Sequence, residues 1–186
     1  MKRQMVSVLA PDRVGLLCAV TEVVLRHGGN IGAIRQTIVG GYFSLVFVLE
    51  VPDGFDGGRF ARELEGIAGV VSVTVGAYEP GSGRGANGEG SCFVTTLSGP
   101  DRPGTILGVS RFLVGHGVNI EDWRVEREGE RVVYTARLDV PAGVEPGALR
   151  EGLAATAKGL GLESHLCHEN IIRATNEIGP IKSILE

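Results

Sequence analysis

The chain carries one sequence unit twice, and this repeat constrains its fold more than any other feature. The stretch "LAPDRVG" at 9–15 returns as "SGPDRPG" at 98–104, so that Asp12 superposes on Asp101 with an offset of 89 (101 − 12). The same offset, without a gap, aligns three more pairs: His27 with His116, Asn30-Ile31 with Asn119-Ile120, and Val51-Pro52 with Val140-Pro141. So consistent a register over so long a period indicates two copies of one domain and not a solenoid.

A polar stretch separates the copies. Residues 79–90, "EPGSGRGANGEG", are rich in Gly, Ser, Asn and charge and offer little apolar surface to bury. We therefore expect a first domain at 1–78, a linker at 79–90, a second domain at 91–168 and a C-terminal segment at 169–186.

Each half shows the same order of predicted elements. A β-rich run (5–10, 91–98) stops at Pro-Asp, and a helix with apolar residues at helical spacing follows and ends at His27 or His116 before glycine. A hairpin (34–51, 123–140), a more polar second helix (57–69, 146–160) and a last strand (70–78, 162–167) complete the unit. The order βαββαβ predicts an α+β, ferredoxin-like fold, with an antiparallel sheet and both helices on one face.

The two hairpins differ in character. The first is strongly apolar, whereas the second alternates charged with apolar residues, as a strand with one wet face does. We therefore expect the first hairpin to be buried between the halves or against a second chain, with Tyr42 and Phe43 at that contact.

The strand, the Pro-Asp-Arg-x-Gly turn, the helix and the Gly-x-Asn-Ile entry into a hairpin together resemble the ACT domain family, in both halves. Two such domains with little else are similar to the glycine cleavage system repressor group of ACT proteins. "RQTIVGGYFSLVFVLEV" is similar to the hairpin of that group, and "CHENIIRATNEI" to the short C-terminal segment of single-domain relatives. ACT domains are regulatory modules that bind amino acids, so the resemblance implies a small amino acid at ACT–ACT interfaces and no cofactor.

The residues at the turn suit a zwitterion. The first N–H groups of a helix have no internal partner and carry partial positive charge, which favours a carboxylate. Glycine lets a ligand approach the main chain, and Pro103 is suited to the first helical turn. The candidate ligand-binding residues are Asp12, Arg13, Val14, Gly15, Asn30 and Ile31 in the first half, and Asp101, Arg102, Pro103, Gly104, Asn119 and Ile120 in the second.

Each polar candidate has a structural alternative. The aspartates either cap their helices or cap them and also accept from a ligand ammonium. The asparagines are either turn residues or ligand contacts, and the arginines either lie in solvent or grip a carboxylate. We expect Ile31 and Ile120 to pack in the core, the two histidines to favour the helix dipole, and Trp123 to be a core residue.

Bulk properties exclude several classes. A formal net charge of −4 without a basic block disfavours nucleic acid, and no apolar run is long enough to span a bilayer. Three widely separated cysteines indicate reduced thiols, and with no signal-peptide pattern we expect a cytoplasmic protein. His165, Cys167 and His168 are too few, and too divided between strand faces, for a metal site.

No catalytic motif is present, and the two halves with their linker occupy nearly the whole chain. The leading hypothesis is an amino-acid sensor that regulates a protein partner, by resemblance a transcription factor, with a homodimer expected. The alternative is a ligand-free scaffold that binds through its sheet edges, and a remoter one is an enzyme with a site between the halves. Residues 170–186 are expected to form a short docking helix that ends at Gly179-Pro180.

Overall fold

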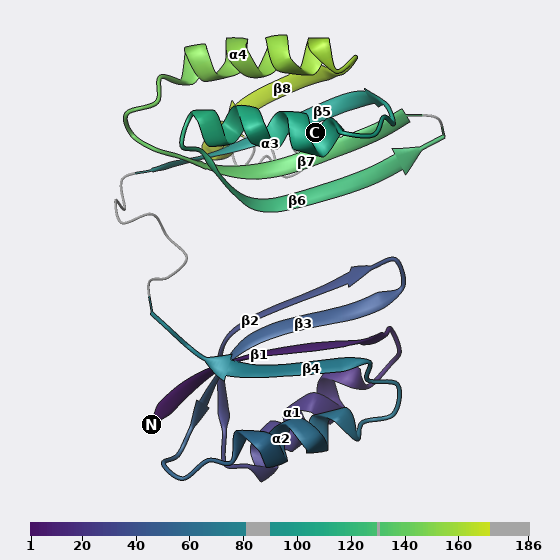
Figure 1. Cartoon of the computed structure of the whole chain (residues 1–186), viewed down its shortest axis with the longest axis vertical. Helices are drawn as coiled ribbons and strands as arrows, with labels where there is room; N and C mark the ends of the chain where they lie inside the picture. The colour runs from purple at the N-terminus through teal and green to yellow at the C-terminus, as the bar shows by residue number, and fades with distance from the viewer. Residues whose placement is uncertain (81–89, 130, 172–186) are drawn as a thin grey trace, which may run out of the picture. The chain divides into compact units, whose positions relative to one another are not determined.

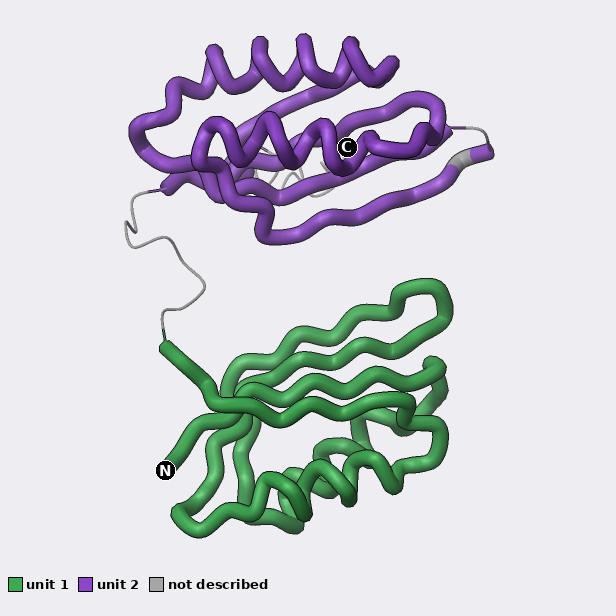
Figure 2. Tube along the Cα trace, in the orientation of Figure 1, with its two compact units in different colours: residues 1–82 green, residues 83–186 purple. Residues whose placement is uncertain are grey.

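A computed structural model describes residues 1–80, 90–129 and 131–171 of the chain. The chain divides into two compact units, residues 1–82 and 83–186 (Figure 2). Most of the expected linker and the expected C-terminal helix, with its Gly179-Pro180 end, lie outside the described residues.

The first unit is a βαββαβ fold with two helices on one face of a four-stranded antiparallel sheet (Figure 1). The strand order is β2-β3-β1-β4. Its elements are β1 (Lys2–Pro11), α1 (Leu16–Arg26), β2 (Asn30–Val39), β3 (Tyr42–Val51), α2 (Gly57–Glu65) and β4 (Ser72–Ala77).

The second unit repeats this topology with the order β6-β7-β5-β8. Its elements are β5 (Ser91–Pro100), α3 (Thr105–Gly115), β6 (Asn119–Glu128), β7 (Arg131–Val140), α4 (Pro146–Gly159) and β8 (Glu163–His168). The α+β, ferredoxin-like prediction is confirmed for both halves.

Alternation along the strands builds each core. In β1, Val6, Val8 and Ala10 are fully buried beneath the helices, while the residues between them lie on the open face of the sheet. Each hydrophobic core cluster contains residues of its own half alone. Ile31 and Ile120 pack against these cores as expected, and so does Trp123.

Glycines with positive φ lie where the chain reverses or a helix ends. The first hairpin turns at Gly40 and Gly41, both with positive φ (58° and 81°), as a two-residue turn that matches the strand twist requires. His27 and His116 are the C-caps of α1 and α3, and a left-handed glycine follows each.

The prediction that Phe43 lies at a contact outside its unit is wrong. Phe43 is 2% exposed in the core of the first unit, whereas its neighbour Tyr42 is 46% exposed on the open face of the sheet. Adjacent residues of a strand point to opposite faces, and Phe43 is on the face that the helices cover. The edge strand β2 is exposed from Gly32 to Val39 in the unit taken by itself.

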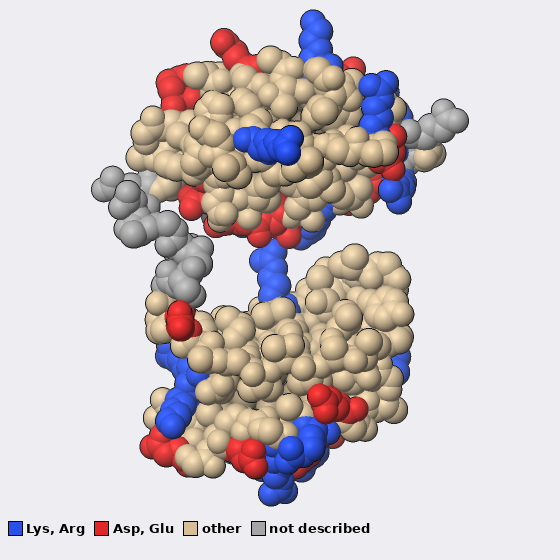
Figure 3. All heavy atoms as spheres, in the orientation of Figure 1, with Lys and Arg blue, Asp and Glu red and all other residues tan. Residues whose placement is uncertain are grey.

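The open face of the second sheet is polar, as its alternating sequence predicts. The hairpin of β6 and β7 buries one side of β7 and leaves charged and polar residues on the other. On the face in Figure 3, acidic and basic side chains are interspersed over both units.

Candidate functional site

The turn between the first strand and first helix of each unit is built around an open glycine. Gly15 and Gly104 are the N-caps of α1 and α3, with φ of 91° and 89°. A β-carbon added at either position would meet nothing within 4 Å, so the main chain is accessible there. The first helical bonds run from Ala19 N to Gly15 O and from Gly108 N to Gly104 O, both 2.9 Å.

The capping role expected for the two aspartates is wrong. Neither helix has a side-chain hydrogen bond at its N-cap, because each helix begins four residues after the aspartate and a glycine holds the cap position. Pro103 likewise precedes the cap and lies outside the first helical turn of α3. Asp12 instead fixes the turn through its main chain, since its N–H donates to Gly41 O of the hairpin at 2.8 Å.

The arginines of both turns lie against the glycine turn that leads into the last strand. Arg13 Nη2 donates to Ala68 O at 2.9 Å. In the second unit, the guanidinium of Arg102 lies beside Gly161, where an added β-carbon would come within 2.9 Å of Nη1. Val14, between the arginine and the glycine, is fully exposed.

The two aspartates differ in their partners. Asp101 Oδ2 accepts from Arg127 Nη2 at 2.8 Å, and its Oδ1 accepts from Tyr134 Oη at 3.3 Å. The Asp12 carboxylate is exposed, and no hydrogen-bond or ion-pair partner for it occurs in the described part of the chain. The carboxylate of the second turn is thus paired with an arginine, whereas the carboxylate of the first turn is free.

The structure does not bring the aspartates and asparagines of one unit together. Asn30 begins β2, where it pairs with Glu50 of β3, and Glu50 in turn pairs with Arg3 near the start of β1. The turn at Asp12 follows Pro11 at the other end of β1. The eight steps from Arg3 to Pro11 span about 26 Å at roughly 3.3 Å per residue.

Both asparagines are exposed and face an acidic residue across the ladder. Asn30 Nδ2 donates to Glu50 Oε2 at 3.5 Å, and Asn119 pairs with Asp139 at the equivalent register. The turn and the asparagine of one unit are therefore too far apart to contact the same small ligand.

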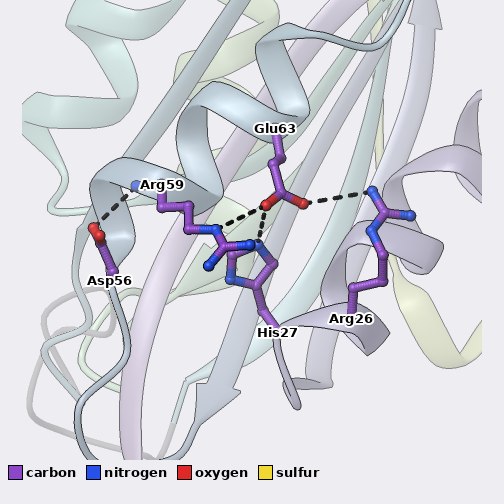
Figure 4. A network of polar contacts seen from close by, with 5 residues as sticks. All are labelled: Arg26, His27, Asp56, Arg59 and Glu63. Carbon is purple, nitrogen blue, oxygen red and sulfur yellow. Dashed lines mark hydrogen bonds and ion pairs between the residues drawn. The ribbon is translucent and has the colours of Figure 1, made fainter.

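A charged cluster on the helix side of the first unit was not predicted (Figure 4). Glu63 of α2 accepts from Arg59 Nε at 3.2 Å, while His27 Nε2 lies 3.2 Å from the same oxygen and Arg26 Nη2 lies 3.6 Å from the other. These four side chains line a hollow of about 390 Å³. The His27 ring, with its side chain 12% exposed, packs edge-on against Phe60.

The cluster shifts the titration of its carboxyl. Burial opposes ionisation and alone would raise the pKa of Glu63, but hydrogen bonds from Arg59 and His27 outweigh it and lower the pKa below the ordinary value. His27 at the end of α1 thus contacts α2 through Glu63. Only the helical spacing of Arg59 and Glu63 signalled part of this cluster in the sequence.

The second unit pairs its helices without such a cluster. Gly152 of α4 lies so close to the Phe112 ring of α3 that an added β-carbon would be 2.8 Å from it. His116 approaches Phe112 O through Nδ1 at 2.8 Å and has no acidic partner among the described residues. The charged cluster is therefore a property of the first unit and is not needed by the fold.

The cysteines that titrate abnormally are poorly suited to nucleophilic chemistry. The hydrogen bond and negative charge of Glu22 raise the pKa of Cys18, and burial raises the pKa of Cys92. In the described ranges, no three His, Cys, Asp or Glu side chains are grouped so as to hold a metal ion. Nor is any helix in those ranges long and apolar enough to cross a membrane.

These features define the class of the protein: a tandem of ferredoxin-like βαββαβ domains, each with an accessible turn at the head of its first helix. One ACT domain model matches residues 4–69, and a second ACT domain model matches residues 91–166. The chain therefore belongs to the ACT domain family and carries two of these regulatory domains in tandem.

Two related proteins each match a stretch of this chain that is about one domain long. A UPF0237 protein of Pyrobaculum aerophilum is 35% identical over 79 residues, which cover 42% of this chain and 88% of the relative. A UPF0237 protein of Methanopyrus kandleri is 37% identical over 87 residues, which cover 46% of this chain and 96% of the relative.

Two crystal structures match over most of the chain, across both units. An unknown protein from Galdieria sulphuraria has a TM-score of 0.73 at 19% identity, over 90% of this chain and 98% of its own. A "putative glycine cleavage system transcriptional repressor" has a TM-score of 0.63 at 14% identity, over 89% and 96%. At these identities the likeness shows the fold alone.

Proposed function

We propose that this protein is an amino-acid-sensing regulator that is not an enzyme. The observation that carries the proposal is the turn of Gly15 and Gly104, where the main chain lies open beside a carboxylate. The N–H groups that precede Ala19 and Gly108 in the two helices face this turn without an α-helical partner, which suits a ligand carboxylate.

The ligand is a small amino acid bound where ACT units meet. Its carboxylate is held by main-chain N–H groups of the turn and its ammonium by the aspartate. An asparagine from another ACT unit, Asn30 or Asn119, completes the contacts, since the asparagine of the same unit lies at the far end of the sheet. Arg13, Val14 and their counterparts border this site.

The bound amino acid regulates a partner by favouring one arrangement of ACT units over another. A ligand shifts such an equilibrium only by as much as its affinities for the two arrangements differ, typically 1 to 3 kcal/mol in allosteric proteins. We propose a transcriptional regulator of glycine or related metabolism as the partner, a homodimer as the working form and the cytoplasm as its place. The family resemblance and the name of the repressor-like neighbour support this choice.

The test is titration calorimetry of the whole chain with glycine, serine, alanine and larger amino acids. We expect heat from at least one small amino acid and a matching rise in melting temperature, because a ligand that binds only the folded state stabilises it. If no amino acid gives heat or a thermal shift, the chain is the ligand-free scaffold and not a sensor.

A further inference from the structure

The duplication provides an internal comparison of the two turns. The partners of Asp101 are Arg127 in β6 and Tyr134 in β7, and the offset of 89 places Ile38 and Leu45 at these positions in the first unit. The strand registers agree with this alignment: Arg127 pairs with Val132, and Ile38 pairs with Phe43 at the same offset. The four residues therefore occupy equivalent places beside the two turns.

In the second unit, the protein's own side chains donate to the carboxylate of the turn. The Arg127 guanidinium lies 2.8 Å from one carboxylate oxygen of Asp101, and the hydroxyl of the buried Tyr134 lies 3.3 Å from the other. At the head of α3, the N–H and the hydroxyl of Thr105 both bond to Arg102 O, at 3.4 and 3.0 Å. A cation is thus already paired with this carboxylate.

In the first unit, neither equivalent residue can donate a hydrogen bond. Leu45 is completely buried, and Ile38 is 54% exposed and carries no charge. The Asp12 carboxylate remains exposed, without a partner in the described part of the chain. A free carboxylate beside an exposed apolar side chain can accept an external ammonium and contact the carbon atoms next to it.

We propose that the first turn alone accepts the ammonium of the amino-acid ligand, and that Arg127 occupies the corresponding place in the second turn. Ile38 and Arg127 thereby decide which half binds. This inference rests on the proposed function and adds that each chain binds one ligand, through Asp12. A ligand ammonium at the second turn would have to displace the Arg127 guanidinium, which lies 2.8 Å from Asp101 and is tethered to the same chain.

Exchanging the two deciding residues tests the proposal. With the amino acid that binds the wild-type chain, calorimetry is expected to give one ligand per chain. Ile38→Arg should weaken binding severalfold, because the new guanidinium pairs with Asp12 as an exposed ion pair. Arg127→Ile should leave the first site unchanged and add a second binding event, since it removes the cation that is paired with Asp101.

Asp12→Asn is a second test of the first turn, and Asp101→Asn is its matched control in the second. Both aspartates are exposed, and the first change should weaken binding at least tenfold while the second should alter it less than twofold. Circular dichroism and melting curves establish that each variant is folded. Arg127→Ile keeps the test valid if Ile38→Arg fails to fold, because it alters only the second unit.

The outcomes separate this inference from the proposed function. Two ligands per wild-type chain, or binding lost in Asp101→Asn and kept in Asp12→Asn, overturns the assignment to the first turn and leaves the sensor intact. Absence of binding by any amino acid to the wild-type chain overturns both.

Discussion

Gly99→Ala is the substitution whose cost the structure defines most directly. A β-carbon on Gly99 of β5 would lie 2.7 Å from Leu162 Cδ2 and 2.8 Å from Gly161 O. The leucine can rotate away, but the carbonyl belongs to the backbone turn that leads into β8. The added methyl group must therefore push the start of β8 away from β5, beneath the turn that carries Arg102.

Two opposing contributions set the magnitude. Inserting a methyl group into a packed site costs about 1–3 kcal/mol, while replacing glycine by alanine inside a strand recovers roughly 0.5–1 kcal/mol of chain entropy. We expect the second unit to lose about 1–2 kcal/mol. With a urea dependence of about 1 kcal/mol per M for a small domain, its unfolding midpoint should fall by about 1–2 M.

Urea unfolding followed by tryptophan fluorescence is the assay. Trp123 is the only tryptophan of the chain and packs against the second core, so its emission reports that unit. Gly159→Ala in α4 is the matched control, because an added β-carbon there meets nothing within 4 Å. It should raise the midpoint slightly. If Gly99→Ala raises the midpoint as well, β8 moves freely and the close approach does not constrain the unit.

Three further predictions concern single contacts. Glu63→Gln should lower the stability of the first unit at neutral pH, whereas at acid pH the variant and the wild type should be nearly equally stable. The reason is that the folded-state pKa of Glu63 is lowered. Such a carboxyl contributes its full stability above its unfolded pKa of about 4.3 and loses that contribution as the pH falls through the folded value. Unfolding followed by circular dichroism from pH 3 to 7 measures this, and an unchanged pH profile would contradict it. Arg13→Ala should cost the first unit about 1 kcal/mol through loss of the bond to Ala68 O; in the same denaturation series Val14→Ala should cost nothing, and equal effects would count against that bond. Trp123→Phe should stay within about 1 kcal/mol of wild type by circular dichroism, because Nε1 is buried without a partner among the described residues; a much larger loss would reveal a hydrogen bond that the structure lacks.

The order and type of the elements could be predicted because they depend on local sequence. Apolar residues at helical spacing, alternation in the strands and glycine at chain reversals are readable without knowing what packs against what. The burial of Phe43 could not be read in this way, because β3 is apolar on both faces and its register with β1 decides which face the helices cover. The sequence pattern showed that the strand is apolar but not which side is the core.

The site was predicted less completely, because its contacts join distant parts of the chain. The partners of Asp101 are 26 and 33 residues away in sequence, and the cluster around Glu63 joins two helices. The separation of Asp12 from Asn30 could have been predicted from the order of the elements. The helix α1 begins at the turn and runs back along the sheet, so β2 must start at the far end. Sequence recurrence singled out the candidate residues, but the topology determines which of them meet.

The two separate cores have a consequence for how the halves can diverge. Each unit closes its interior with its own residues, so the free-energy effects of core substitutions in the two units should simply add. A turn in one copy can then gain or lose a recognition role without unfolding the other. After duplication of such a domain, one copy can therefore keep its fold and its turn while substitutions change the turn of the other copy.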